Sequence, residues 1–235
     1  MSDLRASAAR ESQSGPFETG DLAHMALPNI GTPNTEMLHR RGKRLAGLSG
    51  LALIVVGLCT AAAAEAGQAS SSLPTNFAVP TRVETPDFKL VPLGPDLVDI
   101  DFKAYMSSID YLQRTFTRST DWPHKDISHA DAMRDMETER ERFRKRQSFA
   151  YAVLTPDGRR ELGSVYVSPK AVGPYDGVVR MWVTKAEYDA GFDAKLYQWV
   201  RGWMRKAWPF AKVAYPGRSI DWKTWDSLVA AKQTP

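Results

Sequence analysis

Cysteine is nearly absent from this chain of 235 residues, in which Cys59 is the only one. Because Cys59 lies inside an apolar segment, the remainder has no disulfide, no reactive thiol and no cysteine-ligated metal site. The sequence also lacks the G-x-S-x-G, P-loop and zincin signatures. These absences remove the usual sequence support for a hydrolase, a kinase or a metalloprotease.

A strongly basic surface is missing as well. The formal net charge is +4 at pH 7. The densest basic run, Arg140 to Arg146, alternates with Glu139 and Glu141, which is typical of a solvated helix face. Nucleic-acid binders usually show a basic patch or a recognisable module, and neither is found. We therefore expect no nucleic acid among the partners.

Histidine is scarce, and only His124 and His129 follow the apolar segment. Aspartates surround them, but the group straddles an expected loop and helix start without the fixed ligand spacing of a zinc site. Asp126 and Asp131 fit turn and helix-cap positions better. We therefore expect no metal.

A basic cluster followed by an uncharged segment marks the N-terminal part. Residues 1–44 form a polar extension that ends in basic residues, and residues 45–64 carry no charge. The pattern Ala64-Glu65-Ala66 closes the segment 45–66. This order describes a secretory signal, which predicts export of the remainder to the periplasm or the extracellular space.

Other interpretations of this segment stay open. Twenty apolar residues at about 1.5 Å each are long enough to span a membrane, so residues 45–64 could remain as an anchor with the domain outside. A buried core helix is a further alternative. Translation from Met37 instead of Met1 would give a compact signal, and if residues 1–86 are a misassigned start the domain is cytoplasmic.

The remainder alternates between strand-like and helix-like patterns. Residues 67–86 are rich in Ser, Pro and Thr, and this composition predicts a linker. Ser128 with Asp131 predicts a helix-capping box, and TPDG at 155–158 predicts the turn of a hairpin. We expect strands at 88–91, 148–154, 161–169, 177–184 and 212–215, and helices at 96–116, 128–146, 193–208 and 221–231.

Several short stretches occur in an order that has a counterpart in a known family. They are DWP at 121–123, FAYAVL at 149–154, LGSVYVSP at 162–169, VRMWV at 179–183, WPF at 208–210 and YPGR at 215–218. Together they resemble a divergent, little-characterised group of GCN5-related N-acetyltransferases (GNAT). The resemblance covers about residues 87–220 and leaves 221–235 as a C-terminal helix and tail. It implies an α/β (α+β) fold with a mixed, mostly antiparallel central sheet flanked by helices.

The same resemblance implies a cofactor site for acetyl-CoA. The pantetheine arm would lie along the strand that contains Met181, Trp182 and Val183. The pyrophosphate would meet the amides near Gly191 at the start of the next helix, where unpaired N–H groups favour anions. No metal is implied.

The reaction that the resemblance implies is acyl transfer to an amine. Tyr215 would act as the phenolic acid that protonates the leaving thiolate. Apart from the resemblance, Trp122, in a loop beside Pro123, and Arg218, after the turn that follows the last strand, are candidates for contacts with the substrate. The resemblance does not specify which amine or which acyl donor.

A second hypothesis follows from the loop TKAEYDAGFDAK at 184–195. It contains one glycine, flanked by Glu187, Asp189 and Asp193. Each carboxylate would repel a pyrophosphate by on the order of 1 kcal/mol at surface dielectric. The loop therefore favours an alternative in which the chain is an exported, non-catalytic GNAT-fold binding module of the cell envelope with a degenerate coenzyme A site.

Overall fold

The computed structural model describes residues 73–233. The predictions for the basic cluster, the apolar segment and the start at Met1 or Met37 fall outside these residues. Within them, no helix is long and apolar enough to cross a membrane.

A six-stranded sheet forms the centre of the described part, with its strands in the order β1-β2-β3-β4-β5-β6. Neighbouring strands are antiparallel from β1 to β5, and β5 pairs with β6 in parallel. This confirms the prediction of a mixed, mostly antiparallel sheet flanked by helices. The strands are β1 (Val83–Glu84), β2 (Lys89–Pro92), β3 (Phe149–Leu154), β4 (Glu161–Ser168), β5 (Gly177–Val183) and β6 (Val213–Ala214).

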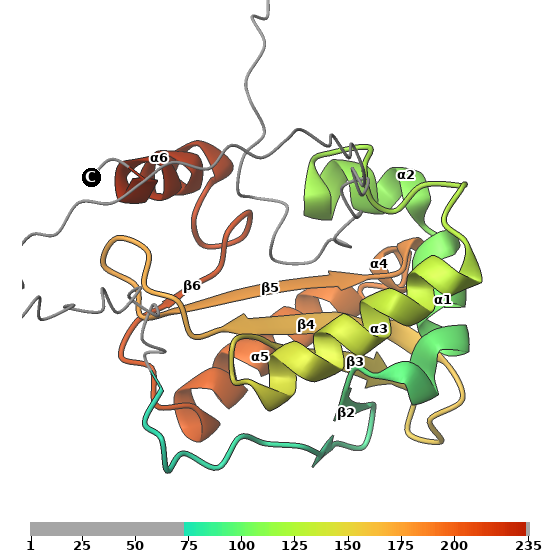
Figure 1. Cartoon of the computed structure of the whole chain (residues 1–235), viewed down its shortest axis with the longest axis horizontal. Helices are drawn as coiled ribbons and strands as arrows, with labels where there is room; N and C mark the ends of the chain where they lie inside the picture. The colour runs from blue at the N-terminus through green and yellow to red at the C-terminus, as the bar shows by residue number, and fades with distance from the viewer. Residues whose placement is uncertain (1–72, 234–235) are drawn as a thin grey trace, which may run out of the picture.

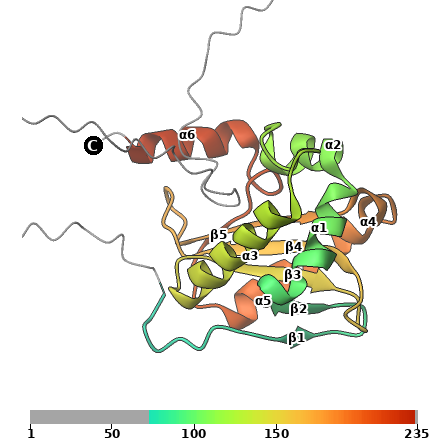
Figure 2. The same ribbon diagram turned by 45° about the vertical axis from the view of Figure 1, so that its right-hand side comes forward.

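Helices cover both faces of the sheet, so the central strands are buried on both sides. Figure 1 shows α1 (Val98–Met106) and α3 (His129–Arg144) in front of the sheet and α5 (Phe192–Ala207) behind it. Successive side chains of a strand point to opposite faces. In β3, Ala150 and Ala152 therefore join the core under α1 and α3, whereas Tyr151 joins the core under α5. The helix α6 (Trp222–Gln233) lies at the opposite end of the sheet from β1 (Figure 2).

The two strongest local signals of the sequence are confirmed. β3 and β4 form the predicted antiparallel hairpin, and Gly158 closes its turn at φ +77°, a conformation that favours glycine. Ser128 and Asp131 form the predicted capping box at the start of α3. Short-range patterns of this kind specify their own geometry, so they can be identified without tertiary information.

The prediction of a single helix at 96–116 is wrong, because this region consists of shorter helical segments with a break between α1 and α2 (Ile109–Leu112). It consists of η2 (Pro95–Leu97), α1, α2 and the π-helical turn η3 (Gln113–Thr117). Ser107 Oγ donates to Ala104 O at 2.6 Å, and Ser108 Oγ accepts from Lys185 N at 2.9 Å. Serine side chains that bond to backbone groups compete with the helical pattern, and here they turn the chain between α1 and α2.

The prediction that Asp193 caps a helix is also wrong. A short helix, α4 (Lys185–Asp189), forms first, and Thr184 Oγ1 caps it by accepting from Glu187 N at 3.3 Å. The helix α5 begins after Gly191, whose φ of +79° makes a sharp corner between the two helices. This corner leaves Asp193 inside the first turn of α5.

Residues 73–86, the described part of the segment for which the composition predicts a linker, pack against the domain. Arg146 donates to Pro74 O at 2.9 Å and to Phe77 O at 3.0 Å. Tyr151 donates from its hydroxyl to Pro80 O at 2.8 Å, and β1 pairs with β2. The composition of the segment does not show these contacts, because their donors lie far away in the sequence.

Candidate functional site

The site begins where β5 and β6 separate. The two strands pair only through Gly177 with Val213 and Val178 with Ala214. Beyond Val178, no other strand of the described part pairs with this edge of β5. Backbone N–H and C=O groups on such an edge are available to a ligand.

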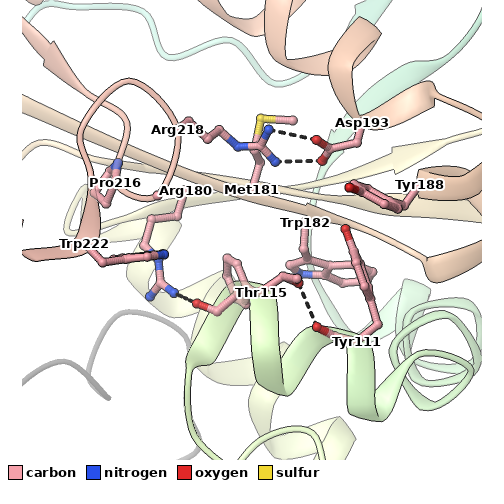
Figure 3. Close-up of a pocket in the computed structure, with 12 residues that line it drawn as sticks. Tyr111, Thr115, Arg180, Met181, Trp182, Tyr188, Asp193, Pro216, Arg218 and Trp222 are labelled. Atoms are coloured by element: carbon pink, nitrogen blue, oxygen red, sulfur yellow. Dashed lines mark hydrogen bonds and ion pairs between the residues drawn. The ribbon is translucent and has the colours of Figure 1, made fainter.

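A cavity of about 170 Å³ lies along this free edge. We call it the β5–β6 cleft (Figure 3). Its wall comes from four parts of the chain that are distant in sequence. These parts contribute Tyr111, Thr115 and Phe116 from α2 and η3, Arg180, Met181 and Trp182 from β5, Tyr188 and Asp193 from α4 and α5, and Pro216, Gly217, Arg218 and Trp222 from the C-terminal part.

Arg180 places a positive charge in the cleft that no carboxylate compensates within residues 73–233. Its guanidinium donates to Phe116 O and lies over the Phe116 ring at 4.3 Å, with Trp222 at 5.9 Å. Burial lowers the pKa of Arg180 to about 10, so the group stays charged at neutral pH. A partly buried cation of this kind gains most from an anionic or polar ligand group.

Arg218 also lines the cleft, but its charge is already paired. Its two terminal nitrogens donate to the Asp193 carboxylate at 2.9 and 2.7 Å, and its guanidinium lies over the Tyr197 ring at 5.1 Å. Both side chains of the ion pair are largely buried. The role predicted for Arg218 in substrate binding stays a prediction, and Asp193 competes with any anion for this side chain.

The acidic loop is less repulsive than its sequence indicates, because each of its carboxylates is paired with a cation. Glu187 bonds to Arg160 at 2.5 Å and Asp189 bonds to Lys185 at 2.6 Å, while Asp193 holds Arg218. A side chain added at Gly191 would meet nothing within 4 Å, so the corner is open. Charge repulsion therefore gives weaker support to a degenerate coenzyme A site than the sequence implied.

Two phenols form one end of the cleft. Figure 3 shows Tyr111 and Tyr188 side by side, and their ring centroids are 5.2 Å apart. Burial, followed by the nearby Asp193 carboxylate, raises the pKa of Tyr111. Tyr111 therefore holds its proton at neutral pH and can donate it.

The other sequence-predicted residues lie in different surroundings. Met181 and Trp182 line the cleft, whereas Val183 and Gly191 are not part of its wall. Tyr215 is 8% exposed, its ring meets that of Tyr197 edge-on at 5.5 Å, and it does not line the cleft. Burial raises the pKa of Tyr215 to about 12. Its role as a proton donor stays a prediction.

Trp122, predicted to contact the substrate, does not line the β5–β6 cleft, and its predicted role stays a prediction. It is 5% exposed and packs against Tyr105 at 5.1 Å and Trp182 at 6.4 Å between ring centroids. The DWP motif does not predict this burial, because the residues that cover Trp122 belong to other elements of the fold and not to the loop itself.

Tyr111, Tyr188 and Trp222 are cleft residues that the sequence did not single out, and the resemblance assigned a role to the backbone of Arg180 but none to its side chain. Arg180 did carry a signal, since it is the only charged residue of the apolar strand GVVRMWV. Tyr111 carried none, because it reaches the cleft only through the break between α1 and α2. Among residues 73–233, no group of histidine, cysteine and acidic side chains could hold a metal ion.

No protein-family model matches the sequence, and a search of curated proteins finds no match.

Solved structures of acetyltransferases resemble parts of this chain. Ribosomal-protein-S5-alanine acetyltransferase from Vibrio fischeri shares 14% identity over 66% of this chain and 82% of its own, with a TM-score of 0.43. RimL, a ribosomal L7/L12 α-N-protein acetyltransferase in complex with coenzyme A, shares 13% identity over 55% of this chain and 68% of its own, with a TM-score of 0.41.

A third structure, from Vibrio cholerae, is assigned as a ribosomal-protein-serine acetyltransferase. It shares 14% identity with a TM-score of 0.36, and the match covers 47% of this chain and 59% of that chain, less than two thirds of its length. These matches concern the fold alone.

Proposed function

We propose that this chain transfers an acyl group from an acyl-coenzyme A thioester to an amine in the β5–β6 cleft. The observation that supports this function most is the free edge of β5 beside a cavity of about 170 Å³. Pantetheine is an extended chain with two amide groups, and an extended amide chain can pair with a free strand edge as a peptide does. The residues of the cleft therefore fit this arm of the cofactor.

Two side chains of the cleft have the chemistry that the reaction needs. The Arg180 guanidinium can stabilise the negative charge that develops on the acyl oxygen during attack. As the carbon–nitrogen bond forms and the carbon–sulfur bond breaks, a phenol can donate its proton to the leaving thiolate. The proton that the attacking nitrogen loses then passes to the phenolate or to water, so the protons balance. Tyr111 is the phenol that lines the cleft, and its raised pKa keeps it protonated until then.

Release of free thiol from acetyl-CoA in the presence of a panel of amines tests this function. We expect acyl transfer by the full chain, and we expect Arg180→Gln to lower kcat by roughly 10- to 1,000-fold. Arg159→Gln is a matched control, because Arg159 is an arginine of the exposed hairpin turn. Absence of amine-dependent thiol release over the whole panel would contradict the proposal.

A binding module without turnover is the second candidate. Two residues that were expected to act on the substrate favour this candidate. Arg218 is held in an ion pair by Asp193, and Tyr215 packs outside the cleft wall. A module of this kind would still bind an anionic ligand at Arg180. Saturable binding of acetyl-CoA without thiol release separates the two functions.

A further inference from the structure

A second cavity lies between α1, α3 and the sheet, outside the β5–β6 cleft. Its volume is about 30 Å³, which is room for one group of the size of a water molecule. Three carboxyl groups and three aromatic rings dominate its wall, and we call it the acidic cavity. The carboxyl groups belong to Asp101, Asp135 and Glu139, and the rings to Tyr105, Trp122 and Tyr166.

Two residues that line this cavity have buried polar atoms without a partner. Tyr105 is 2% exposed and its hydroxyl has no hydrogen-bond partner in the described residues. Glu139 is 8% exposed, and its Oε2 has no partner there either. Buried polar groups are nearly always satisfied, so two such atoms in one wall indicate a missing polar occupant.

A donor with positive charge suits this wall. Burial raises the pKa of Asp135 to about 7, so its carboxyl is charged above neutral pH and a cation binds there most tightly. Glu139 accepts from Arg142 at 2.8 Å, whereas Asp101 and Asp135 form no ion pair with any described residue. Arg142 is thus the only cation bound to the three carboxyl groups. Glu161 lies next to Asp101 and adds a fourth carboxyl, one oxygen of which accepts from Ser164 at 2.7 Å.

The aromatic rings and the small volume narrow the class of cation. Tyr105 and Trp122 lie 5.1 Å apart between centroids, and ring faces attract cations. A primary ammonium group is about as large as a water molecule and has three N–H donors, which suits carboxylate and phenol oxygens. A quaternary ammonium has no donor and exceeds the volume of the cavity.

We propose that the acidic cavity binds the ammonium group of a primary alkylamine, with Asp135, Glu139 and Tyr105 as hydrogen-bond acceptors. Asp135 and Thr138 are half-buried residues of its wall on α3, so the alkyl chain leaves on this side. The site is separated from the β5–β6 cleft by Trp182, whose Nε1 donates to Tyr166 Oη at 3.4 Å. The proposal therefore does not depend on acyl transfer.

The test is an NMR titration of the full chain with n-butylammonium, with n-butanol and tetramethylammonium as matched probes that lack the charge or the donors. We expect saturable shifts of amide signals in α1 and α3 with n-butylammonium only. Asp135→Asn and Tyr105→Phe should each weaken the binding at least about fivefold, which corresponds to one lost polar contact. Glu137→Gln removes an exposed charge from the same helix and should leave the affinity unchanged.

Absence of saturable shifts in α1 and α3 would overturn the proposal. It would equally be overturned if Asp135→Asn and Tyr105→Phe bound n-butylammonium as tightly as the unchanged chain, or if tetramethylammonium bound as well. Tyr105→Phe loses only a hydroxyl without a partner, so it keeps the test valid if Asp135→Asn alters the fold.

Discussion

At the residue scale, Arg180 and Asp135 are ionisable side chains that form no ion pair with a described residue. Arg180 lines the β5–β6 cleft, and Asp135 lines the acidic cavity. Charged side chains of the neighbouring helices α4 and α5 do form ion pairs, such as Glu187 with Arg160 and Asp193 with Arg218. An ionisable group without an ion pair in a cavity wall favours a ligand of opposite charge. This adds to the free edge of β5 in the proposal for the cleft, and to the unpartnered polar atoms in the proposal for the acidic cavity.

The identity of the proton donor can be tested with two phenols. We expect Tyr111→Phe to lower kcat by roughly 100-fold with a smaller change in KM, because a general acid acts in the transition state. Tyr215→Phe should have the smaller effect, since Tyr215 does not line the cleft. Steady-state kinetics with acetyl-CoA measure both. A larger loss in Tyr215→Phe would restore the role that the sequence indicated.

The buried carboxyls predict a pH dependence of stability. Burial, followed by Glu139 and Asp131, raises the pKa of Asp135 from 3.8 to about 7. Between these two values the folded state holds a proton that the unfolded state has lost, so the stability contributed by this group falls as the pH rises from about 4 to about 7. Asp135→Asn should therefore raise the free energy of unfolding by about 1 kcal/mol at pH 8, with little change at pH 4.

Urea denaturation at both pH values measures this difference. Glu137→Gln on the same helix is the control, since Glu137 is exposed. A gain in stability at pH 4 that equals the gain at pH 8 would contradict the effect of Asp135.

At the element scale, the parts that were predicted correctly are those whose signals are local. The hairpin and the capping box could be predicted from a few neighbouring residues at the turn and at the start of the helix. Strand β5 could be predicted from the composition of its own seven residues. The helix at 96–116 was wrong because its break depends on Ser108, which is held by the backbone of Lys185, 77 residues away. Contacts of this range leave no periodic pattern in the sequence.

The acidic cavity escaped the sequence analysis for a similar reason. The charged residues at 139–146, at the end of α3, predicted a solvated helix face. Glu139 is nevertheless buried against α1 and the sheet. Only the packing of α1 on α3 shows which carboxylates face inward.

Two glycines test how tightly the elements pack. A Cβ at Gly163 would lie 2.1 Å from Trp182 O on the neighbouring strand β5, so Gly163→Ala should destabilise the fold by about 1–3 kcal/mol. A Cβ at Gly202 in the helix α5 would meet nothing within 4 Å. Gly202→Ala should therefore stabilise the protein by about 0.5–1 kcal/mol. Thermal denaturation of both variants measures this contrast, and equal shifts of Tm in the same direction would refute it.

At the scale of the whole molecule, the compartment decides whether an acyl-CoA is available. We propose, from the basic cluster and the apolar segment 45–66, that the domain is exported. Acyl-CoA thioesters are made in the cytoplasm, so an exported enzyme would need a supply of its acyl donor outside. The compartment of the domain therefore decides which acyl donor it can meet, and the proposals of export and of acyl transfer are tested by separate measurements.

The mass of the native protein tests export. Cleavage after Ala66 predicts a mature chain that begins at Gly67 and is found outside the cytoplasm. Fractionation followed by intact mass measurement gives the compartment and the N-terminus together. A chain that keeps residues 45–64 in the soluble cytosol would contradict export, and a chain that keeps them in the membrane fraction would identify an anchor.

The most direct measurement for the central claim is an NMR titration of the full chain with acetyl-CoA. Binding along the free edge of β5 predicts saturable shifts of the amide signals of residues 179–183 and of the Arg180 side chain, while the signals of β2, far from the cleft in the sheet order, stay in place. Arg180→Gln should weaken the binding. Saturation without any shift in β5, or no binding at all, would contradict the assignment of this cleft to an acyl-CoA.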